Sequence, residues 1–306
     1  MLALIAVVSP GRFESFGKDH TMTDATVIAL HCSLGSGRQW MRLADALGPR
    51  YRVIAPDIAG YGDNGVARPN LPTKLSDEVV LLGEQLAQAA GPFHLVGHSY
   101  GGAIAFKMAT SEPWAGRIRS LTLIEPVLPT LLRDNDADRR LHDGFAELGG
   151  QVNVDLWNGM HMEALDRFLA FWDGSAAAET LPGEARLRMM EQIEKVAFEF
   201  RAIFAEDDVA AAAAMLRLPT LLVSGGLSPY MTQRIVGRLA ALIPGAETRH
   251  LPAAGHMLPM SHARILNPDI AAHIELAEEI ARLLRSPPTE AIQVRTKERH
   301  LRLLSS

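Results

Sequence analysis

A serine between two glycines is the first pattern in the sequence that could carry chemistry. The stretch GHSYG, residues 97–101, fits the G-x-S-x-G pattern and stands where an apolar run gives way to a small-residue, helix-like stretch. A sharp strand-to-helix turn here would strain the backbone at Ser99, and the flanking glycines leave room for the close approach of the chain. The hydroxyl would then project at the carboxyl ends of the strands, where open α/β sheets bind ligands. Ser99 is therefore predicted to be a nucleophile, the alternative being a buried serine that caps a helix.

A serine nucleophile also needs a base that accepts its proton and returns it to the leaving group, a task that suits an imidazole titrating near neutrality. His98 adjoins the serine but points elsewhere if Ser99 sits at the tip of a turn, so we predict that it packs. His256 follows the last strand-like run and is the candidate base, with a structural loop histidine as the alternative. His250 and His262 lie six residues to either side of it, a spacing that no common metal motif uses, so no metal site is predicted.

Short apolar runs bounded by turn residues alternate with longer helix-like segments, a pattern typical of a mostly parallel sheet covered by helices. Six runs are predicted to be buried strands: 25–32, 51–57, 93–99, 120–126, 219–225 and 247–256. Five segments are predicted to be helices: 38–48, 74–90, 100–112, 231–243 and 262–285. The predicted fold class is therefore α/β, with a mostly parallel central sheet flanked by helices.

The alternation breaks once, between residues 127 and 216, where no strand-like run occurs and the apolar residues have helical spacing. We interpret this stretch as a helical cap insertion that forms a lid over a pocket, the alternative being a helical domain that serves only for packing. The predicted domains are a core of residues 22–126 and 216–286, a cap of residues 127–215, and a loosely held tail of residues 287–306.

The composition limits the partners and the location. The chain has 306 residues, of which 48% are hydrophobic and 21% charged, which suffices for one core with an appended lid. A net charge of −5 without a basic cluster in the body of the chain argues against a nucleic acid partner.

Cys32 is the single cysteine, so no intrachain disulfide forms, which fits a cytoplasmic location. No apolar run approaches the roughly 20 residues of a membrane span, the opening stretch lacks the basic residues of a secretion signal, and the start is expected at Met1 or Met22.

Four stretches resemble a known family: LHCSLGSGRQW, APDIAGYGDN, GHSYGG and PAAGHMLP. From about residue 25 to residue 285 the chain resembles the α/β-hydrolase fold family, specifically its single-chain members with a helical cap. The resemblance implies that His256 reaches back to Ser99 and acts as the base.

The resemblance also implies an oxyanion site made of the backbone N–H groups of Ser33 and Tyr100. Cys32 stands where the family usually has glycine, which leaves Leu34 as the next candidate for the first donor. The thiol of Cys32 is predicted to pack, because a second nucleophile would need its own activating base.

The acid that would stabilise the imidazolium is missing from its customary place. In the family it follows the strand that corresponds to residues 219–225, but this chain has the neutral Ser228 there. Some members carry the acid at the end of the preceding strand, which here is Glu125, a charged residue that closes an apolar strand and therefore needs a partner. Two alternatives stay open: Asp57 or Asp63 supplies the acid, or the Ser-His pair lacks one and reacts weakly.

These residues predict a serine hydrolase that acts on a small, mostly apolar carbonyl compound through an acyl-enzyme at Ser99, without a cofactor. A carboxylester is the favoured substrate, followed by lactones and carbon-carbon substrates. The alternatives are a catalytically weak ligand-binding relative and an acyltransferase that acts on a small molecule. Four residues are predicted to line an apolar substrate pocket: Leu34, Trp157, Phe171 and Trp172.

Overall fold

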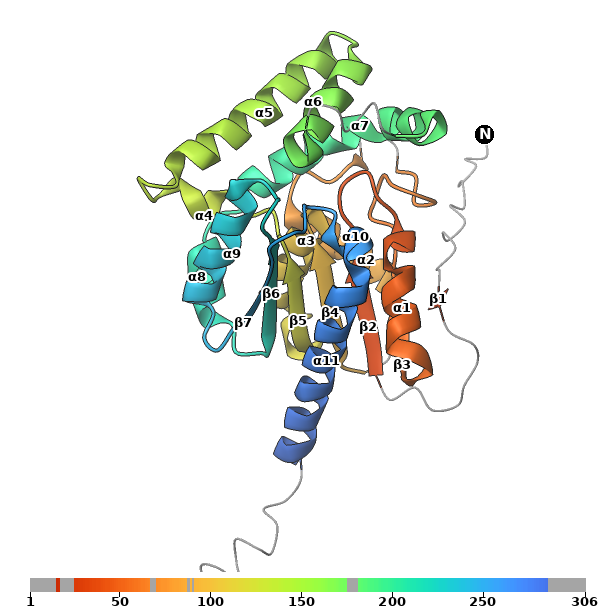
Figure 1. Ribbon diagram of the computed structural model, residues 1–306, viewed down its shortest axis with the longest axis vertical. Helices are drawn as coiled ribbons and strands as arrows, with labels where there is room; N and C mark the ends of the chain where they lie inside the picture. Colours follow the sequence, from red (N-terminus) through yellow and green to blue (C-terminus); the bar gives the residue numbers. More distant parts are fainter. Residues whose placement is uncertain are drawn as a thin grey trace, which may run out of the picture.

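A seven-stranded sheet forms the centre of the computed structural model, which describes residues 15–16, 25–66, 70–86, 89, 91–174 and 181–285 (Figure 1). The strand order is β1-β3-β2-β4-β5-β6-β7, and all neighbouring strands are parallel except β1 and β3. The strands are β1 Ser15–Phe16, β2 Ala25–Leu30, β3 Tyr51–Ile54, β4 Phe93–His98, β5 Ile118–Ile124, β6 Thr220–Gly225 and β7 Glu247–Leu251. The six strands predicted from the sequence are confirmed as β2 to β7, and the sheet is mostly parallel as predicted.

The strand order brings the carboxyl ends of the central strands together at one edge of the sheet. Gly97 near the end of β4 pairs with Leu30 at the end of β2 on one side and with Leu123 in β5 on the other. β6 lies next to β5 in turn. Residues that directly follow β2, β4, β5 and β6 therefore meet in a small region, although they are far apart in the sequence.

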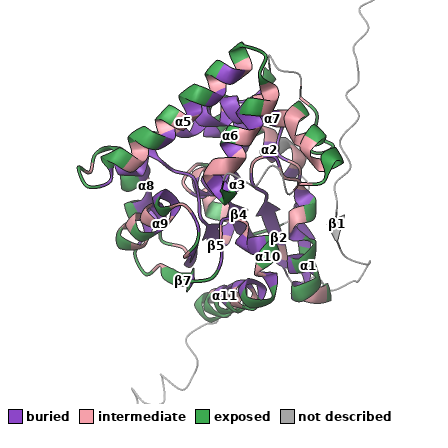
Figure 2. Cartoon of the chain, turned by 45° about the horizontal axis from the view of Figure 1, so that its top comes forward, coloured by how far each residue is buried: buried purple, intermediate pink, exposed green. Residues whose placement is uncertain are grey.

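Helices cover both faces of the sheet, so its central strands are buried and read as continuous apolar runs (Figure 2). Leu95 and Val96 are neighbours in β4 and point into two separate apolar cores. One face carries α1 (Met41–Leu47) and α11 (Ala263–Arg285), and the other carries α2 (Leu75–Leu86), α3 (Tyr100–Ala109) and α9 (Tyr230–Leu242). With a 3-10 turn over Gly37–Trp40 before α1, these elements confirm the five predicted helices.

Between β5 and β6, where the sequence predicted a helical insertion, the described residues form five helices. They are α4 (Thr130–Arg133), α5 (Arg139–Trp157), α6 (His161–Asp173), α7 (Gly183–Phe204) and α8 (Val209–Met215). Figure 1 shows α5, α6 and α7 above the edge of the sheet at which the central strands end. The predicted tail at residues 287–306 and the predicted start at Met1 or Met22 lie outside the described residues.

The rings of the helical segment form a core of their own above the sheet. Phe145 of α5 lies 5.1 Å from Phe200 of α7 and 5.9 Å from Trp172 of α6, measured between ring centroids. Gly149 permits this packing, because a Cβ atom there would come within 2.7 Å of the Phe200 ring. An ion pair from Arg234 of α9 to Asp138, which precedes α5, ties the segment to the body of the protein.

Two glycines allow α3 to approach the sheet closely enough to place the residue before it at the strand ends. A Cβ atom at Gly101 would lie 2.3 Å from the carbonyl oxygen of His31 and 2.6 Å from that of Leu30. A Cβ atom at Gly97 would lie 2.5 Å from the carbonyl oxygen of Gly101. The glycines of the GHSYG pattern are therefore required by contacts with backbone, which cannot move aside as a flexible side chain can.

Replacing Gly101 with alanine is expected to lower the free energy of unfolding by about 1–3 kcal/mol or more, because the added methyl group overlaps the end of β2. Gly116→Ala is the matched control, since no atom lies within 4 Å of a Cβ atom there, and its effect should stay within about 0.5 kcal/mol. Urea denaturation followed by circular dichroism measures both values. Equal stability of the two variants would contradict this account of the α3 packing.

Candidate active site

Ser99 occupies the turn between β4 and α3, and its backbone is held in a conformation that non-glycine residues rarely adopt. Its φ and ψ angles are 56° and −119°. The turn is secured by hydrogen bonds to the next strand: the Ser99 N–H donates to the Ile124 carbonyl at 3.0 Å, and the Val127 N–H donates to the Ser99 carbonyl at 3.2 Å. Strain of this kind persists only where the surroundings enforce it, and it is frequent at functional sites.

The structure brings Ser99, His256 and Glu125 together at the edge of the sheet. Nε2 of His256 lies 2.9 Å from Oγ of Ser99, and Nδ1 of His256 lies 2.6 Å from Oε2 of Glu125. All three side chains are buried. The second carboxylate oxygen of Glu125 accepts the Gly225 N–H at 2.7 Å. A carboxylate on Nδ1 fixes the tautomer in which Nε2 can accept the serine proton, and it stabilises the imidazolium that results.

Ser228 and Asp57, which stand at the other positions considered for the acid, do not occupy the place of Glu125 beside the His256 ring. Ser228 lies in the turn after β6 and is buried, and its hydroxyl has no hydrogen-bond partner among the described residues. Asp57 accepts the N–H groups of Gly37 at 2.7 Å and of Asp63 at 2.8 Å, so it fixes a turn. The carboxylate that contacts the His256 ring is that of Glu125.

Two rings enclose the His256 imidazole. Trp172 of α6 stacks on it at a centroid distance of 4.0 Å and an interplanar angle of 19°, and His98 lies at 4.9 Å. Nε2 of His98 donates to the His256 carbonyl at 2.9 Å, and Nδ1 accepts from the Gln39 amide at 3.1 Å. Burial holds the pKa of His98 well below its usual range, so this ring stays neutral and packs, as the sequence predicted.

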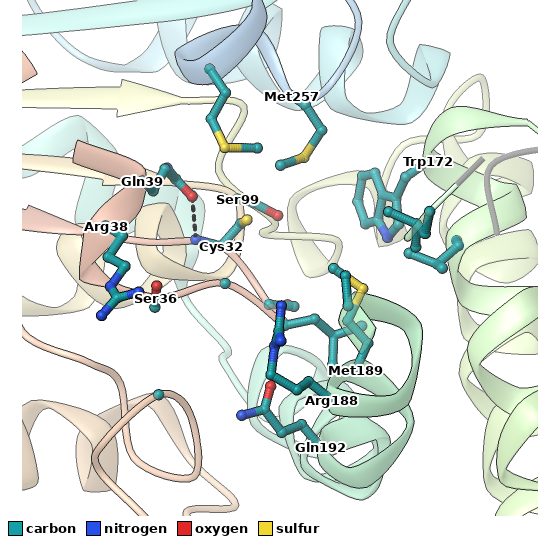
Figure 3. Close-up of a pocket in the computed structure, with 18 of the residues that line it drawn as sticks. Cys32, Ser36, Arg38, Gln39, Ser99, Trp172, Arg188, Met189, Gln192 and Met257 are labelled. Carbon is teal, nitrogen blue, oxygen red and sulfur yellow. Dashed lines mark hydrogen bonds between the residues drawn. The ribbon is translucent and has the colours of Figure 1, made fainter. Parts of the chain in front are cut away.

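The candidate oxyanion donors lie beside the serine. Tyr100 is the first residue of α3, so its N–H has no acceptor within the helix, and Ser33 lies in the loop after β2. Both residues line the same small cavity as Ser99. The preceding N–H, that of Cys32, is engaged by Oε1 of Gln39 at 3.2 Å (Figure 3).

Hydrogen bonds of His31 hold the loop that carries Ser33, and the Cys32 thiol in this loop is buried. His31 donates from Nδ1 to the Cys32 carbonyl at 2.7 Å and accepts the Ile58 N–H on Nε2 at 2.9 Å, while burial lowers its pKa to about 4. Burial raises the pKa of the Cys32 thiol to about 12, so it stays protonated and packs. Leu34 adopts a positive φ of 56° and borders the larger cavity described next.

A cavity of about 980 Å³ opens over Ser99 and His256. Figure 3 shows Ser99 and Met257 on one side of it and Trp172 and Met189 of the helical segment on the other. The predicted lining residues Leu34 and Trp172 border this cavity.

Two predicted pocket residues lie elsewhere. Trp157 is 91% exposed at the end of α5 and does not border the cavity. Phe171 packs against the Phe145 and Trp172 rings at 5.2 and 4.9 Å. Met189 and Met257 also line the cavity and were not predicted to do so, although Met257 directly follows the candidate base.

A group of buried charges lies next to the candidate oxyanion donors and was also missed. The Glu199 carboxylate of α7 accepts the hydroxyl of Ser33, and the Glu78 carboxylate of α2 accepts the hydroxyl of Tyr100 at 2.8 Å. The Lys195 ammonium, also on α7, bonds to Glu78. Burial raises the pKa of Glu199 to about 7. The sequence does contain a sign of these charges: Lys195 and Glu199 are four residues apart on the face of α7 that also carries the apolar Val196 and Phe200.

Among the described residues, no cluster of three or more histidine, cysteine, aspartate or glutamate side chains could hold a metal ion. None of the helices in the described part of the chain is long and apolar enough to cross a bilayer.

Comparisons with known proteins show the family of the chain. The sequence model of the alpha/beta hydrolase fold family matches residues 25–263. Lipase LipV of Mycobacterium tuberculosis is 35% identical over 105 residues, which are 34% of this chain and 38% of that protein. The pimeloyl-[acyl-carrier protein] methyl ester esterase of Aeromonas hydrophila is 26% identical over 77% of this chain and 90% of its own. The solved structure of the enol-lactonase from Burkholderia xenovorans superposes with a TM-score of 0.65 at 20% identity, covering 86% of this chain and 96% of that chain, which shows a shared fold.

The raised pKa of Glu199 predicts a pH-dependent stability. The native state keeps the Glu199 proton up to about pH 7 whereas the unfolded chain releases it near pH 4.3, so the unfolding free energy should fall as the pH rises through this window. Glu199→Gln lacks this titration. The free energy of unfolding of the variant minus that of the parent should therefore increase by about 2–4 kcal/mol between pH 5 and pH 8. Urea denaturation at several pH values measures the difference. Glu191→Gln, an exposed residue of the same helix, is the control, and a flat Glu199→Gln difference would contradict the assignment.

Proposed function

The chain belongs to the α/β-hydrolase fold family, and on that premise we propose that it is a serine hydrolase that cleaves small carbonyl compounds through an acyl-enzyme at Ser99. The observation that carries the proposal is the contact of one imidazole, His256, with Ser99 through Nε2 and with Glu125 through Nδ1. A buried histidine that bridges a strained serine and a buried carboxylate has the geometry required for nucleophilic catalysis.

The first half of the reaction forms the acyl-enzyme. Oγ of Ser99 attacks the carbonyl carbon while Nε2 of His256 accepts its proton, and Glu125 stabilises the resulting imidazolium. The carbonyl oxygen becomes an oxyanion, which the N–H groups of Ser33 and Tyr100 bind. The imidazolium then donates its proton to the leaving group as the bond to the carbonyl carbon breaks.

The second half releases the acyl group. A water molecule takes the place of the leaving group near His256, gives a proton to Nε2 and attacks the ester carbon of the acyl-serine. Collapse of the second oxyanion returns the proton to Oγ of Ser99 and frees the carboxylic acid. The enzyme is then restored, and every proton has moved between Ser99, His256 and the reacting molecules.

The walls of the large cavity carry apolar side chains together with charged ones such as Asp173 and Arg188, and a small carboxylester is the substrate that we favour. Trp172 and Met189 come from the segment between β5 and β6, which we propose acts as a cap over the strand ends. Two relatives at 35% and 26% identity bear the names of a lipase and an ester esterase, which supports ester cleavage. Lactones and carbon-carbon substrates offer the same carbonyl to the same groups.

Covalent labelling and turnover test the proposed chemistry. A fluorophosphonate probe should label the parent protein and leave Ser99→Ala unlabelled. Glu125→Gln should lower kcat/KM for an aryl ester by about 10³–10⁴, because the amide cannot stabilise the imidazolium. Mass spectrometry and phenol release measure the two effects.

Ser228→Ala is the matched control for the acid. It alters the position where the family usually has its acid, yet its hydroxyl contacts no partner among the described residues, so kcat/KM should stay within about twofold, or about 0.4 kcal/mol. A parental rate in Glu125→Gln, or a large loss in Ser228→Ala, would overturn the assignment of Glu125 as the acid.

A further inference from the structure

The small cavity of about 20 Å³ beside Ser99 has room for about one water-sized group, which is the size of a single oxyanion. Its wall includes Ser99 and the two residues whose N–H groups are the candidate donors, Ser33 and Tyr100. Glu199 of α7 is the single charged residue among the described residues of this wall. A carboxyl group of the helical segment therefore lies beside the place where a carbonyl oxygen would become negative.

Ser33 lies in a turn whose conformation is strained. The Gly35 N–H donates to the Cys32 carbonyl at 3.1 Å and closes the turn over Ser33 and Leu34. Leu34, the third residue of this turn, has a φ of 56°, where glycine or asparagine is usual. A non-glycine residue stays in such a conformation only where its surroundings enforce it. The shape of the turn, and with it the direction of the Ser33 N–H, depends on the contacts that hold it.

Those contacts hold the two sides of the turn differently. The peptide groups before Ser33 are held from within the sheet domain, where Gln39 accepts the Cys32 N–H at 3.2 Å and His31 donates to the Cys32 carbonyl at 2.7 Å. The side chain of Ser33 itself is held from α7, because its hydroxyl donates to Oε2 of Glu199. Glu199 is the only hydrogen-bond partner of that hydroxyl among the described residues.

The second candidate donor depends on α7 much less. Tyr100 begins α3, so the direction of its N–H is set by that helix. Its hydroxyl donates to Glu78 at 2.8 Å, and Lys195, one turn before Glu199 on α7, also bonds to Glu78. α7 thus contacts the side-chain partners of both donor residues, but it is Ser33, in a loop, whose amide direction these contacts can alter.

We propose that Glu199 is a positioning residue for the oxyanion site: through the hydroxyl of Ser33 it holds the turn so that the Ser33 N–H points at the oxyanion, and it does so as the neutral acid. α7 then does more than cover the strand ends, because it fixes one of the two donors. Glu199 acts through Ser33 and contacts no reacting atom. This inference rests on the proposed hydrolase function, because it assigns a role within that reaction.

The two oxygens of Glu199 suit a neutral acid. Oε2 accepts the Ser33 hydroxyl, whereas Oε1 is buried and has no hydrogen-bond partner among the described residues, so it is the oxygen left to carry the proton. The Tyr61 hydroxyl lies close to the Glu199 carboxyl. Burial raises the pKa of Glu199 to about 7, so the neutral form is populated in the range where a histidine base works.

The surroundings make the charge of Glu199 the one that changes near neutral pH. The titratable groups that face it are Cys32, Tyr61, Glu78, Tyr100 and Lys195. Burial raises the pKa of the thiol and of both phenols, so these groups keep their protons, and the ammonium is bound to Glu78. Ionisation of Glu199 would add a negative charge beside the oxyanion and oppose it.

Two substitutions break the proposed contact from either side. Ser33→Ala keeps the backbone N–H and removes the hydroxyl, and Glu199→Leu removes its acceptor. Each should lower kcat for phenyl acetate by about ten- to hundredfold and leave KM within about twofold, because a misdirected donor weakens the transition state and not substrate binding. The double variant should be within about threefold of the slower single variant, because both substitutions remove the same interaction.

The conservative variant tests the need for a neutral group. Glu199→Gln keeps an acceptor oxygen for Ser33 without a charge, so its kcat/KM at pH 6 should be within about threefold of the parental value. Between pH 6 and pH 8 the parental kcat/KM should fall relative to that of Glu199→Gln by at least about threefold, as Glu199 ionises. The titration of His256 cancels in this ratio. Glu191→Gln, on the exposed side of α7, should follow the parent at every pH.

The outcomes separate the positioning role from the function. A parental kcat in Ser33→Ala, an effect on KM alone, additive losses in the double variant, or a parent to Glu199→Gln ratio that does not change with pH would overturn the role of Glu199 and leave the hydrolase function standing. Circular dichroism shows which variants fold, and if Glu199→Leu does not, Ser33→Ala and Glu199→Gln decide the question. Failure of the parent to hydrolyse the ester or to be labelled at Ser99 would overturn the proposed function itself.

Discussion

The contact between the Glu125 carboxylate and the His256 ring is the interaction on which the candidate site depends. Glu125 directly follows β5, and its two oxygens bind Nδ1 of His256 and the N–H of Gly225 at the end of β6. A buried carboxylate is costly unless hydrogen bonds replace its hydration, and both oxygens are satisfied here. The strand order makes this possible, because β5 lies between β4, which leads to Ser99, and β6, and the next strand, β7, leads to the loop of His256. Moving the acid by one strand therefore keeps it at the same edge of the sheet.

Much of this arrangement could be predicted from the sequence because it depends on local signals. Apolar runs bounded by turn residues mark the strands, and the GHSYG pattern marks a turn whose glycines are required by backbone contacts. Glu125 could be identified because a charged residue that ends an apolar strand needs a partner, and parallel strands end together. These predictions require only the order of the strands and helices along the chain and the fact that parallel strands end at the same edge of the sheet.

The pocket could not be predicted to the same extent, since it depends on the rotation of each helix about its axis. Phe171 and Trp172 are adjacent in α6 and differ by about 100° around the helix. Both contact Phe145, but Trp172 is the one that stacks on His256 and borders the cavity. Trp157, at the last position of α5, is left in solvent. Aromatic residues in a helical segment indicate a core, but the sequence does not say which of them face a ligand.

The buried charges beside the oxyanion donors show a second constraint that the sequence hides, because their partners are 166, 117 and 22 residues apart in the chain. Lys195 neutralises Glu78, which leaves Glu199 as the excess negative group next to the place where a negative oxygen would develop. Two negative charges in a dry site oppose each other, so the ionised form of Glu199 works against the very intermediate that its neighbours Ser33 and Tyr100 would stabilise. Burial, which raises the pKa of Glu199 to about 7, reduces this repulsion by favouring the neutral acid. The protonation state of Glu199 therefore bears on the stability of an oxyanion beside Ser33 and Tyr100.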